Sequence, residues 1–349
     1  MNPFAVTGFS VERRVIPLKV PFITALGRKD SSENVFVSLR LRGGALGRGE
    51  ASGAVVTAAL KPARLAADCS RLAAGLRGRD VRAWGAVARA LRASGRPAPA
   101  AAAVECAALD ALRLALGLSW SAWFGGAGRR VETDATLSAA GPAETREAAG
   151  RAAGEGFKVL KVKVGSGYAP DLERCLAADA AGRSRGRRPT LVLDGNQHLG
   201  RAGAVRLAEA CLARGLRVTL IEQPVPADDL AGLAWVSRRA PVPVAADESV
   251  QSPEDARRVL ESGAAAVVNV KLAKMGPAAA AETVAVARAA GGGLMLGCMQ
   301  ESALGLSPSV GLAMGTGAFT HLDLDSDWLL GAGQPEGAFS RRGPVLTER

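Results

Sequence analysis

The pattern of apolar and polar positions along the chain changes near residue 131. From there on, short apolar runs alternate with Ala-rich stretches of about ten to fifteen residues that are typical of helices. The runs are VETDATLSA, FKVLKVKV, PTLVLD, RVTLIE, VPVAAD, AAVVNVK, GLMLGC and AFTHLDLD. Eight strands joined by helices predict an α/β fold, a (β/α)8 TIM-like barrel over residues 126–334. An open doubly wound sheet is the alternative, although no Gly-rich phosphate turn follows the first strand.

Residues 1–125 follow a different pattern. Two β-rich runs, VERRVIPLKV and NVFVSLRLRG, flank the polar segment TALGRKDSSE, and helical patterns follow as far as Leu118. The run AAAVECAALDALRLALG predicts a long helix that Gly117 closes. This order predicts a separate α+β domain. The tail, residues 335–349, contains Gly and Pro, and we expect it to return to this N-terminal domain.

The composition favours a cytoplasmic protein. A hydrophobic fraction of 48% supports a large core, and no uncharged apolar run of about eighteen residues predicts a membrane span. The N-terminus lacks the basic and then apolar layout of a signal peptide. The 5 cysteines are scattered without a CxxC motif, which favours reduced thiols over a disulfide framework. We therefore expect no membrane partner, and a homo-oligomer is left open.

The net charge of +11 raises the question of nucleic-acid binding. The basic residues are spread as single arginines and short pairs, without a dense basic tract. Aromatic residues that could stack on bases make up only 4% of the chain. We therefore predict that nucleic acid is not a partner and that the charge reflects an Arg-rich surface.

Three consecutive predicted strands end in an acidic residue, namely Asp194, Glu222 and Asp247. Active sites of such barrels lie at the C-terminal ends of the strands, so these carboxylates are expected to converge on the barrel axis. Three hard oxygen ligands suit Mg²⁺ better than zinc or copper. The alternative is that each acid is an ordinary helix cap or loop residue.

Lysine is rare in this chain, yet it is concentrated at the predicted strand ends. Of 44 basic residues only 8 are lysines, and most of these lie in FKVLKVKVG and NVKLAKMG. Lys161 and Lys163 share one face of the second strand, and Lys271 ends the sixth, on roughly the opposite side of a closed barrel. A metal and Lys161 both disfavour a second positive charge on Lys163, which suits a base. A Schiff-base lysine of an aldolase-type barrel is the alternative.

The motifs KVK, DGN, IEQP, ADES, NVKLAKMG and GCMQES occur in this order. The chain thereby resembles the enolase superfamily, in its muconate-lactonising subgroup, over nearly its whole length. The resemblance implies a capping N-terminal α+β domain and Mg²⁺ bound by the three strand-end acids. It also implies that Lys163 and Lys271 act as acid and base, that Lys161 assists them, and that Asn196 lies near the metal. In this family the metal binds a substrate carboxylate and stabilises the enediolate that α-proton removal leaves.

Within the subgroup, the segment HLDLDSD discriminates between activities. Its Asp323 and Asp325 resemble the DxD motif of dipeptide epimerases, whose carboxylates hold the ammonium group of the substrate. Cys298 and Met299, from GCMQES, are expected to line the substrate site. So are Thr24 and Arg28 of the capping loop TALGRKDSSE, which we expect to close over the substrate. Ala-Glu epimerases carry an arginine directly after TAL, whereas here Gly27 follows and the arginine comes one position later.

We therefore predict a Mg²⁺-dependent isomerase, a dipeptide epimerase that moves the α-proton between two lysines. The alternatives within the subgroup are N-acylamino acid racemase, o-succinylbenzoate synthase and muconate cycloisomerase, which do not need an ammonium-binding pair of acids. The alternative from another class is a non-catalytic binding protein on the same barrel. The sequence leaves the identity of the dipeptide open.

Overall fold

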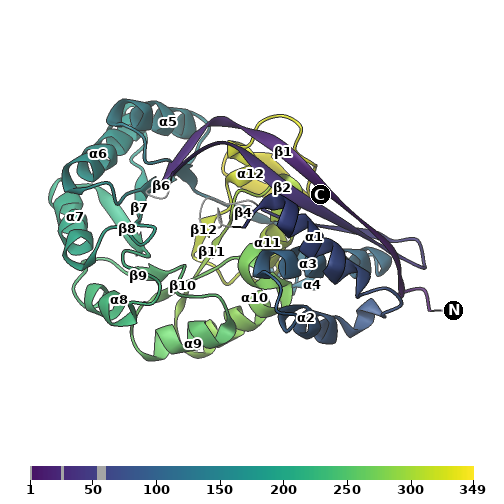
Figure 1. Cartoon of the computed structure of the whole chain (residues 1–349). Helices are drawn as coiled ribbons and strands as arrows, with labels where there is room; N and C mark the ends of the chain where they lie inside the picture. The colour runs from purple at the N-terminus through teal and green to yellow at the C-terminus, as the bar shows by residue number, and fades with distance from the viewer. Residues whose placement is uncertain (1, 25–26, 53–59) are drawn as a thin grey trace.

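The computed structural model describes residues 2–24, 27–52 and 60–349. Its N-terminal part is an antiparallel sheet covered by helices (Figure 1). The sheet order is β1-β2-β3, with β1 (Val6–Thr24), β2 (Gly27–Leu41) and β3 (Leu46–Ala51). The helices are α1 (Pro62–Ala74), the short 3-10 helix η2 (Val81–Ala83), α2 (Trp84–Arg92), α3 (Ala98–Ala115) and α4 (Trp120–Trp123).

The end of α3 is as predicted. Gly117 follows the helix with φ of 66°, a conformation that favours glycine. The next residue, Leu118, donates its backbone N–H to the carbonyl of Arg113 at 2.9 Å, which satisfies a carbonyl of the last helical turn. The glycine therefore ends the helix and turns the chain towards α4.

The predicted barrel is confirmed as an eight-stranded parallel sheet with helices around it (Figure 1). Its strands are β5 (Ala135–Leu137), β6 (Val159–Lys163), β7 (Thr190–Asp194), β8 (Arg217–Glu222), β9 (Val244–Ala246), β10 (Val267–Val270), β11 (Gly293–Gly297) and β12 (His321–Asp323). The helices between them are α5 (Pro142–Gly154), α6 (Tyr168–Ser184), α7 (Arg201–Ala213), α8 (Leu230–Ser237), α9 (Pro253–Glu261), α10 (Leu272–Ala289) and α11 (Ala303–Thr316). A backbone hydrogen bond of 2.9 Å from Asp134 to Leu322 joins the first strand region to the last.

Side chains on the strands alternate between the barrel interior and the helices. The lower interior is filled by apolar residues that are almost completely buried, namely Val192, Leu220, Ala245, Val267 and Met295. A separate and larger apolar layer lies between the strands and α7 to α11. Because each fully buried aliphatic side chain contributes about 1.5–3 kcal/mol, this packing makes the barrel a rigid base for the polar residues above it.

The single strand predicted for VETDATLSA is two strands. β4 (Arg130–Glu132) pairs with the tail strand β14 (Val345–Glu348), which in turn pairs with β13 (Phe339–Arg342). β5 pairs with β6 in the barrel. The tail, expected to return to the N-terminal domain, thus forms its strand pairs with β4 instead. It also contacts the N-terminal part. Ala338 packs against the apolar core there, and the Glu348 carboxylate accepts a 3.0 Å hydrogen bond from the Ser121 backbone.

The polar segment predicted as a loop, TALGRKDSSE, lies largely in a strand. Residues 25–26 are outside the described part, and β1 and β2 pair on both sides of them, from Val6 opposite Leu41 to Thr24 opposite Gly27. This β1–β2 hairpin extends from the N-terminal domain across the barrel (Figure 1). This part of the ribbon lies against the polar mouth of the barrel and not against an apolar core, so it shows no alternation of apolar and polar residues, and the polar composition concealed the strand.

The hairpin is attached to the barrel by backbone contacts. Ala139 donates its N–H to the carbonyl of Ile23 at 2.7 Å, and Gly331 donates to the carbonyl of Pro17 at 2.7 Å. The Lys19 ammonium bonds to the carbonyl of Trp328, beside the short helix α12 (Ser326–Leu329). The N-terminal domain therefore contributes a wall to the barrel mouth. Among the described residues, no helix combines the length and apolarity needed to cross a membrane.

A buried carboxylate fixes the N-terminal domain to the barrel. Glu50 on β3 accepts hydrogen bonds from the backbone N–H of Ser302 at 3.0 Å and of Gly305 at 3.1 Å, at the start of α11. It also accepts from the Ser302 hydroxyl, and from the Asn34 side chain at 2.6 Å. A carboxylate at a helix N-terminus is favoured by the helix dipole. Glu50 therefore sets the position of one domain on the other.

We predict that Glu50→Gln lowers the free energy of unfolding by about 2–3 kcal/mol, because the new amide N–H₂ faces buried donors and leaves them unpaired. Urea unfolding of the purified variant measures the change. The matched control is Glu147→Gln on α5, whose side chain is 74% exposed and which should change stability by less than about 0.5 kcal/mol. Equal stability of the two variants would contradict the role given to Glu50.

Candidate active site

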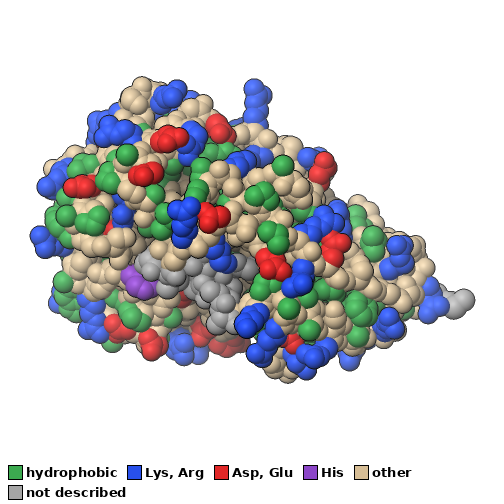
Figure 2. Space-filling view, turned by 45° about the horizontal axis from the view of Figure 1, so that its top comes forward, with side chains coloured by type: hydrophobic (Ala, Val, Ile, Leu, Met, Phe, Trp, Pro, Cys, Tyr) green, Lys and Arg blue, Asp and Glu red, His purple; other side chains and the backbone are tan. Residues whose placement is uncertain are grey.

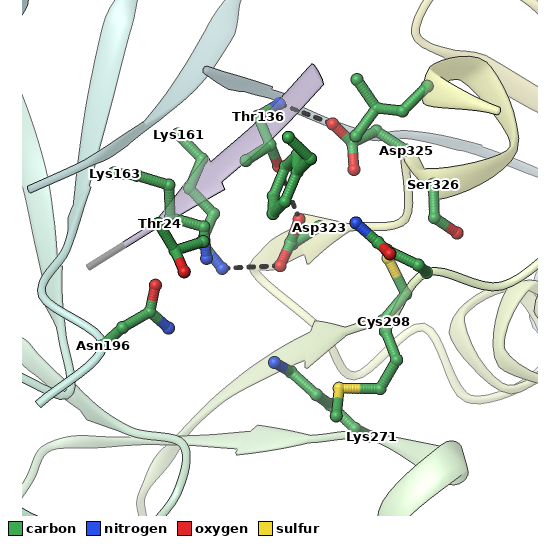
Figure 3. Close-up of a pocket in the computed structure, with 14 residues that line it drawn as sticks. Thr24, Thr136, Lys161, Lys163, Asn196, Lys271, Cys298, Asp323, Asp325 and Ser326 are labelled. Carbon is green, nitrogen blue, oxygen red and sulfur yellow. Dashed lines mark hydrogen bonds and ion pairs between the residues drawn. The ribbon is translucent and has the colours of Figure 1, made fainter. Parts of the chain in front are cut away.

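The predicted lysines and acids meet at the C-terminal ends of the barrel strands. Lys161 and Lys163 both point from β6 into the cavity, as their spacing predicted (Figure 3). The Lys161 ammonium lies 2.9 Å from Asp194 and 2.7 Å from Glu222, and it is almost completely buried. Lys163 lies 2.5 Å from the same Asp194 oxygen. The strands β6, β7 and β8 thus bring two amines and two carboxylates into direct contact.

Asp247 and Lys271 form the opposite wall. Asp247 directly follows β9, and its Oδ2 lies 2.7 Å from the Lys271 ammonium at the end of β10. Its Oδ1 lies 2.6 Å from Lys274, a lysine of the first turn of α10 that also bonds to the backbone carbonyl of Asp247. Gly297 on β11 leaves room for this arrangement, because a Cβ there would lie 2.7 Å from Cε of Lys271.

Burial and mutual charge shift the proton affinities of these groups. Burial alone would lower the pKa of Lys161, but the charges of Asp194, Asp323 and Glu222 raise it well above its ordinary value. Burial also lowers the pKa of Lys271, but the charge of Asp247 raises it by more, so that the pKa lies above its ordinary value. For Glu222, burial and then the Asp194 charge raise the pKa to about 8.

The donor chemistry around the three strand-end acids fits a hard divalent cation. Near these acids, the buried oxygens that accept no hydrogen bond from the described residues include Asn196 Oδ1, Glu248 Oε2 and Asn269 Oδ1. Glu222 Oε2 has the Lys161 ammonium 2.7 Å away. Oxygen-only donor sets of this kind are those that Mg²⁺ prefers. Asp194 and Asp247 each direct a carboxylate oxygen at a lysine. The ligand atoms of the three strand-end acids are therefore further apart than those of one other group at the barrel mouth. That group is Cys298, Asp323 and Asp325, whose ligand atoms lie within 4.8 Å of one another.

Asp323 and Asp325 both face the cavity, as predicted for the end of the last strand (Figure 3). Asp323 Oδ2 lies 2.7 Å from Lys161, so this acid already has a cationic partner in the protein. Asp325 accepts a 2.5 Å hydrogen bond from the backbone N–H of Thr136 on β5. Burial and then the charge of Asp323 raise the pKa of Asp325 to about 6. Asp325 therefore offers a carboxylate to a cation that comes from outside.

The empty space of the cavity is about 600 Å³, including the part of its mouth that is open to solvent. Of the residues expected to contact substrate, Thr24, Cys298 and Met299 line it. Arg28 is not brought to the site. Its side chain is 59% exposed and pairs with Asp30 at 2.9 Å, two residues further along the same face of β2.

Several cavity residues were not predicted from the sequence. Phe22 and Leu329 line the mouth from the hairpin and from α12, and Thr136, Gln300 and Ser326 line the wall near the two aspartates. Thr136 could have been found, because it opposes Lys161 in the register of β5 and β6 and so faces the interior. Ser326 follows the DxD pair directly. Gln300 carries no periodic signal, since it lies in the loop after β11.

Comparison with known proteins gives the family. The family model described as enolase C-terminal domain-like matches residues 144–343. An aromatic dipeptide epimerase of Herpetosiphon aurantiacus is 36% identical over 348 residues, which cover 99% of this chain and 96% of that protein.

Solved structures agree with this result. A substrate-liganded L-Ala-D/L-Glu epimerase from Bacillus subtilis superposes with a TM-score of 0.94 at 31% identity, covering 99% of this chain and 96% of that one. A dipeptide epimerase from Enterococcus faecalis V583, complexed with Mg and L-Leu-L-Tyr, superposes with a TM-score of 0.92 at 28% identity, covering 99% of this chain and 97% of that one. The resemblance found in the motifs is thus confirmed, and the chain belongs to the enolase C-terminal domain-like family.

Proposed function

We propose that this protein is a Mg²⁺-dependent dipeptide epimerase. The observation that carries the proposal is the placement of two buried lysines, Lys163 on β6 and Lys271 after β10, on opposite sides of one cavity with carboxylates between them. An α-carbon held between two amines can lose its proton to one and regain it from the other. The names of relatives that match almost the whole chain support the same activity.

The metal would be held by Asp194, Glu222 and Asp247, with the oxygens of Asn196 and Glu248 nearby. When bound, Mg²⁺ supplies positive charge to the substrate carboxylate as the α-proton leaves, which lowers the cost of the enediolate. Lys161 contributes a fixed positive charge from the floor of the site, since its three carboxylate neighbours keep it protonated. Lys163 and Lys271 hold or move the proton at the two faces of the α-carbon.

The substrate's ammonium group would bind at the DxD pair. Asp323 is committed to Lys161, so Asp325 carries most of this interaction. Binding here separates dipeptides from the N-acylated amino acids and ring-forming substrates of the rival activities, which bring no ammonium group. Thr24, Cys298 and Met299 would contact the remainder of the dipeptide, below the β1–β2 hairpin.

The location of the protein in the cell and its partners remain predictions. Lys and Arg side chains are scattered among Asp and Glu on the face shown in Figure 2, in keeping with a protein that does not bind nucleic acid. We keep the cytoplasmic location as a prediction, on the scattered, unpaired cysteines of the sequence. The division into domains at residues 125 and 126 likewise stays a proposal.

We predict that EDTA abolishes epimerisation and that Mg²⁺ restores it. Calorimetric titration should show one Mg²⁺ site, and Glu222→Gln should weaken it by more than about tenfold, because even residues that only support a metal ligand commonly cost that much. Glu147→Gln is the control and should bind Mg²⁺ as the parent protein does. Full turnover of the metal-free protein would contradict the assignment of the three acids.

We predict that Lys163→Ala and Lys271→Ala each lower epimerisation by at least about 100-fold, since each removes an acid or base from one face. Each variant should still exchange the α-proton of one epimer with D₂O, seen by NMR, because the opposite lysine remains. Lys158→Ala on the outside of the barrel, 62% exposed, should retain parent activity. Loss of exchange for both epimers in both variants would argue against two separate bases.

We predict that Asp325→Asn lowers kcat/KM for free dipeptides by about ten- to a hundredfold, as expected for a charge-assisted bond of about 1.5–3 kcal/mol. N-acetylation of the dipeptide should cost the parent enzyme a similar factor and the variant much less. Equal turnover of N-acetylated and free dipeptides by the parent enzyme would favour the N-acylamino acid racemase alternative instead.

A further inference from the structure

Gln300 is a buried amide that nothing in the proposed reaction uses. It lies between β11 and α11, lines the cavity, and is 7% exposed. Neither its Nε2 nor its Oε1 has a hydrogen-bond partner among the described residues. Buried polar side chains are normally paired, so an amide with both atoms unpaired at a cavity wall points to a ligand that pairs with it.

The backbone of Gln300 is fixed from behind by the N-terminal domain. Its carbonyl oxygen accepts hydrogen bonds from Ser52 Oγ at 2.8 Å, Asn34 Nδ2 at 2.8 Å and Ser32 Oγ at 3.4 Å. All three donors are buried. The loop therefore cannot easily turn the amide outward to water, and the unpaired atoms stay at the cavity wall.

The neighbours of Gln300 indicate which part of a dipeptide it meets. It lines the same cavity as Cys298, Asp325 and Ser326. The next residue in the chain, Glu301, exchanges hydrogen bonds with the Ser326 hydroxyl at 3.2 and 2.6 Å, which places Gln300 close to the segment that carries Asp325. If the substrate's ammonium group binds at Asp325, as in the proposed function on which this inference rests, the α-carbon of the first residue is one bond away. The side chain of that first residue then extends along the same wall.

The peptide link itself does not satisfy Gln300. A trans peptide link directs its N–H and C=O in opposite directions, so one side-chain amide can pair with only one of them. A primary amide can pair with both atoms of Gln300 at once, and a hydroxyl group can donate and accept from a single atom. An apolar side chain would leave both atoms unpaired, and an acidic one would meet the charges of Asp323 and Asp325.

We propose that Gln300 is a specificity-determining residue that selects dipeptides whose first residue carries an uncharged, hydrogen-bonding side chain, such as Gln, Asn, Ser or Thr. A site built to pair with a substrate's polar group discriminates strongly against the analogue that lacks it, because the site's own buried groups are then left unpaired. The preference concerns the first residue and leaves the proton transfer at the second residue unchanged.

The test uses dipeptides with one constant second residue and first residues in pairs of similar size, namely Gln and Met, Asn and Leu, Thr and Val, Ser and Ala. Deuterium uptake at the second α-carbon gives kcat/KM for each. The parent enzyme should favour the polar member of each pair by at least about tenfold. Gln300→Met should remove this preference, mainly through kcat/KM for the polar members, while Gln251→Met, a variant of an exposed residue, should keep it.

The outcomes separate the possibilities. Equal rates for the two members of every pair in the parent enzyme, which needs no variant, would overturn the proposal. An equal loss of kcat/KM for all dipeptides in Gln300→Met would also overturn it. That result would mean that Gln300 binds the peptide link or supports the fold and does not select the first side chain. If all dipeptides take up deuterium at equal rates, the proposed epimerase function stands and only the role given to Gln300 is wrong. If no dipeptide takes up deuterium, the proposed function and the role of Gln300 are both wrong.

Discussion

Charge balance in the barrel mouth is the constraint on which the site depends. Four lysines, Lys161, Lys163, Lys271 and Lys274, are buried there together with a larger number of carboxylates. The buried acids in this set include Asp134, Asp194, Glu222, Asp247, Asp323 and Asp325. Buried charges are tolerated only when they are paired, and here the acids outnumber the amines. Burial raises the pKa of Glu222 to about 8 and that of Asp325 to about 6, so these two acids give up their protons more readily when a positively charged ligand, such as a metal ion or an ammonium group, binds beside them.

The strands determine how this balance is distributed. Ends of neighbouring parallel strands lie side by side, so β7, β8 and β9 present their acids as one row while β6 and β10 place amines on either side. Each lysine pairs with the acid of a neighbouring strand, Lys163 with Asp194 and Lys271 with Asp247. The arrangement therefore follows from strand order.

Much of the barrel and of the candidate site could be predicted, because both follow from the periodic pattern of apolar residues along the strands. Apolar runs that end in an acid or a lysine located the barrel, the three strand-end acids and the lysine pair. Arg28 does not line the cavity, because hairpin pairing, which a polar sequence does not reveal, decides which side chains face it. Gln300 and Gly297 were missed for another reason. The position of Gln300 depends on hydrogen bonds from the distant residues Asn34 and Ser52. The role of Gly297 depends on the space that the Lys271 side chain occupies. Neither relation can be seen in the local sequence.

The β1–β2 hairpin, together with the ends of β11 and β12, forms one side of the site, and the two lysines of the proposed proton transfer come from β6 and from the end of β10. The side chain of a substrate is thus met by one set of segments and its α-carbon by another. Substitutions in the first set can change which substrate is accepted without altering the machinery of the second. Such a separation makes a fold evolvable, and it accounts for relatives of similar architecture whose names refer to aromatic dipeptides in one case and L-Ala-D/L-Glu in another.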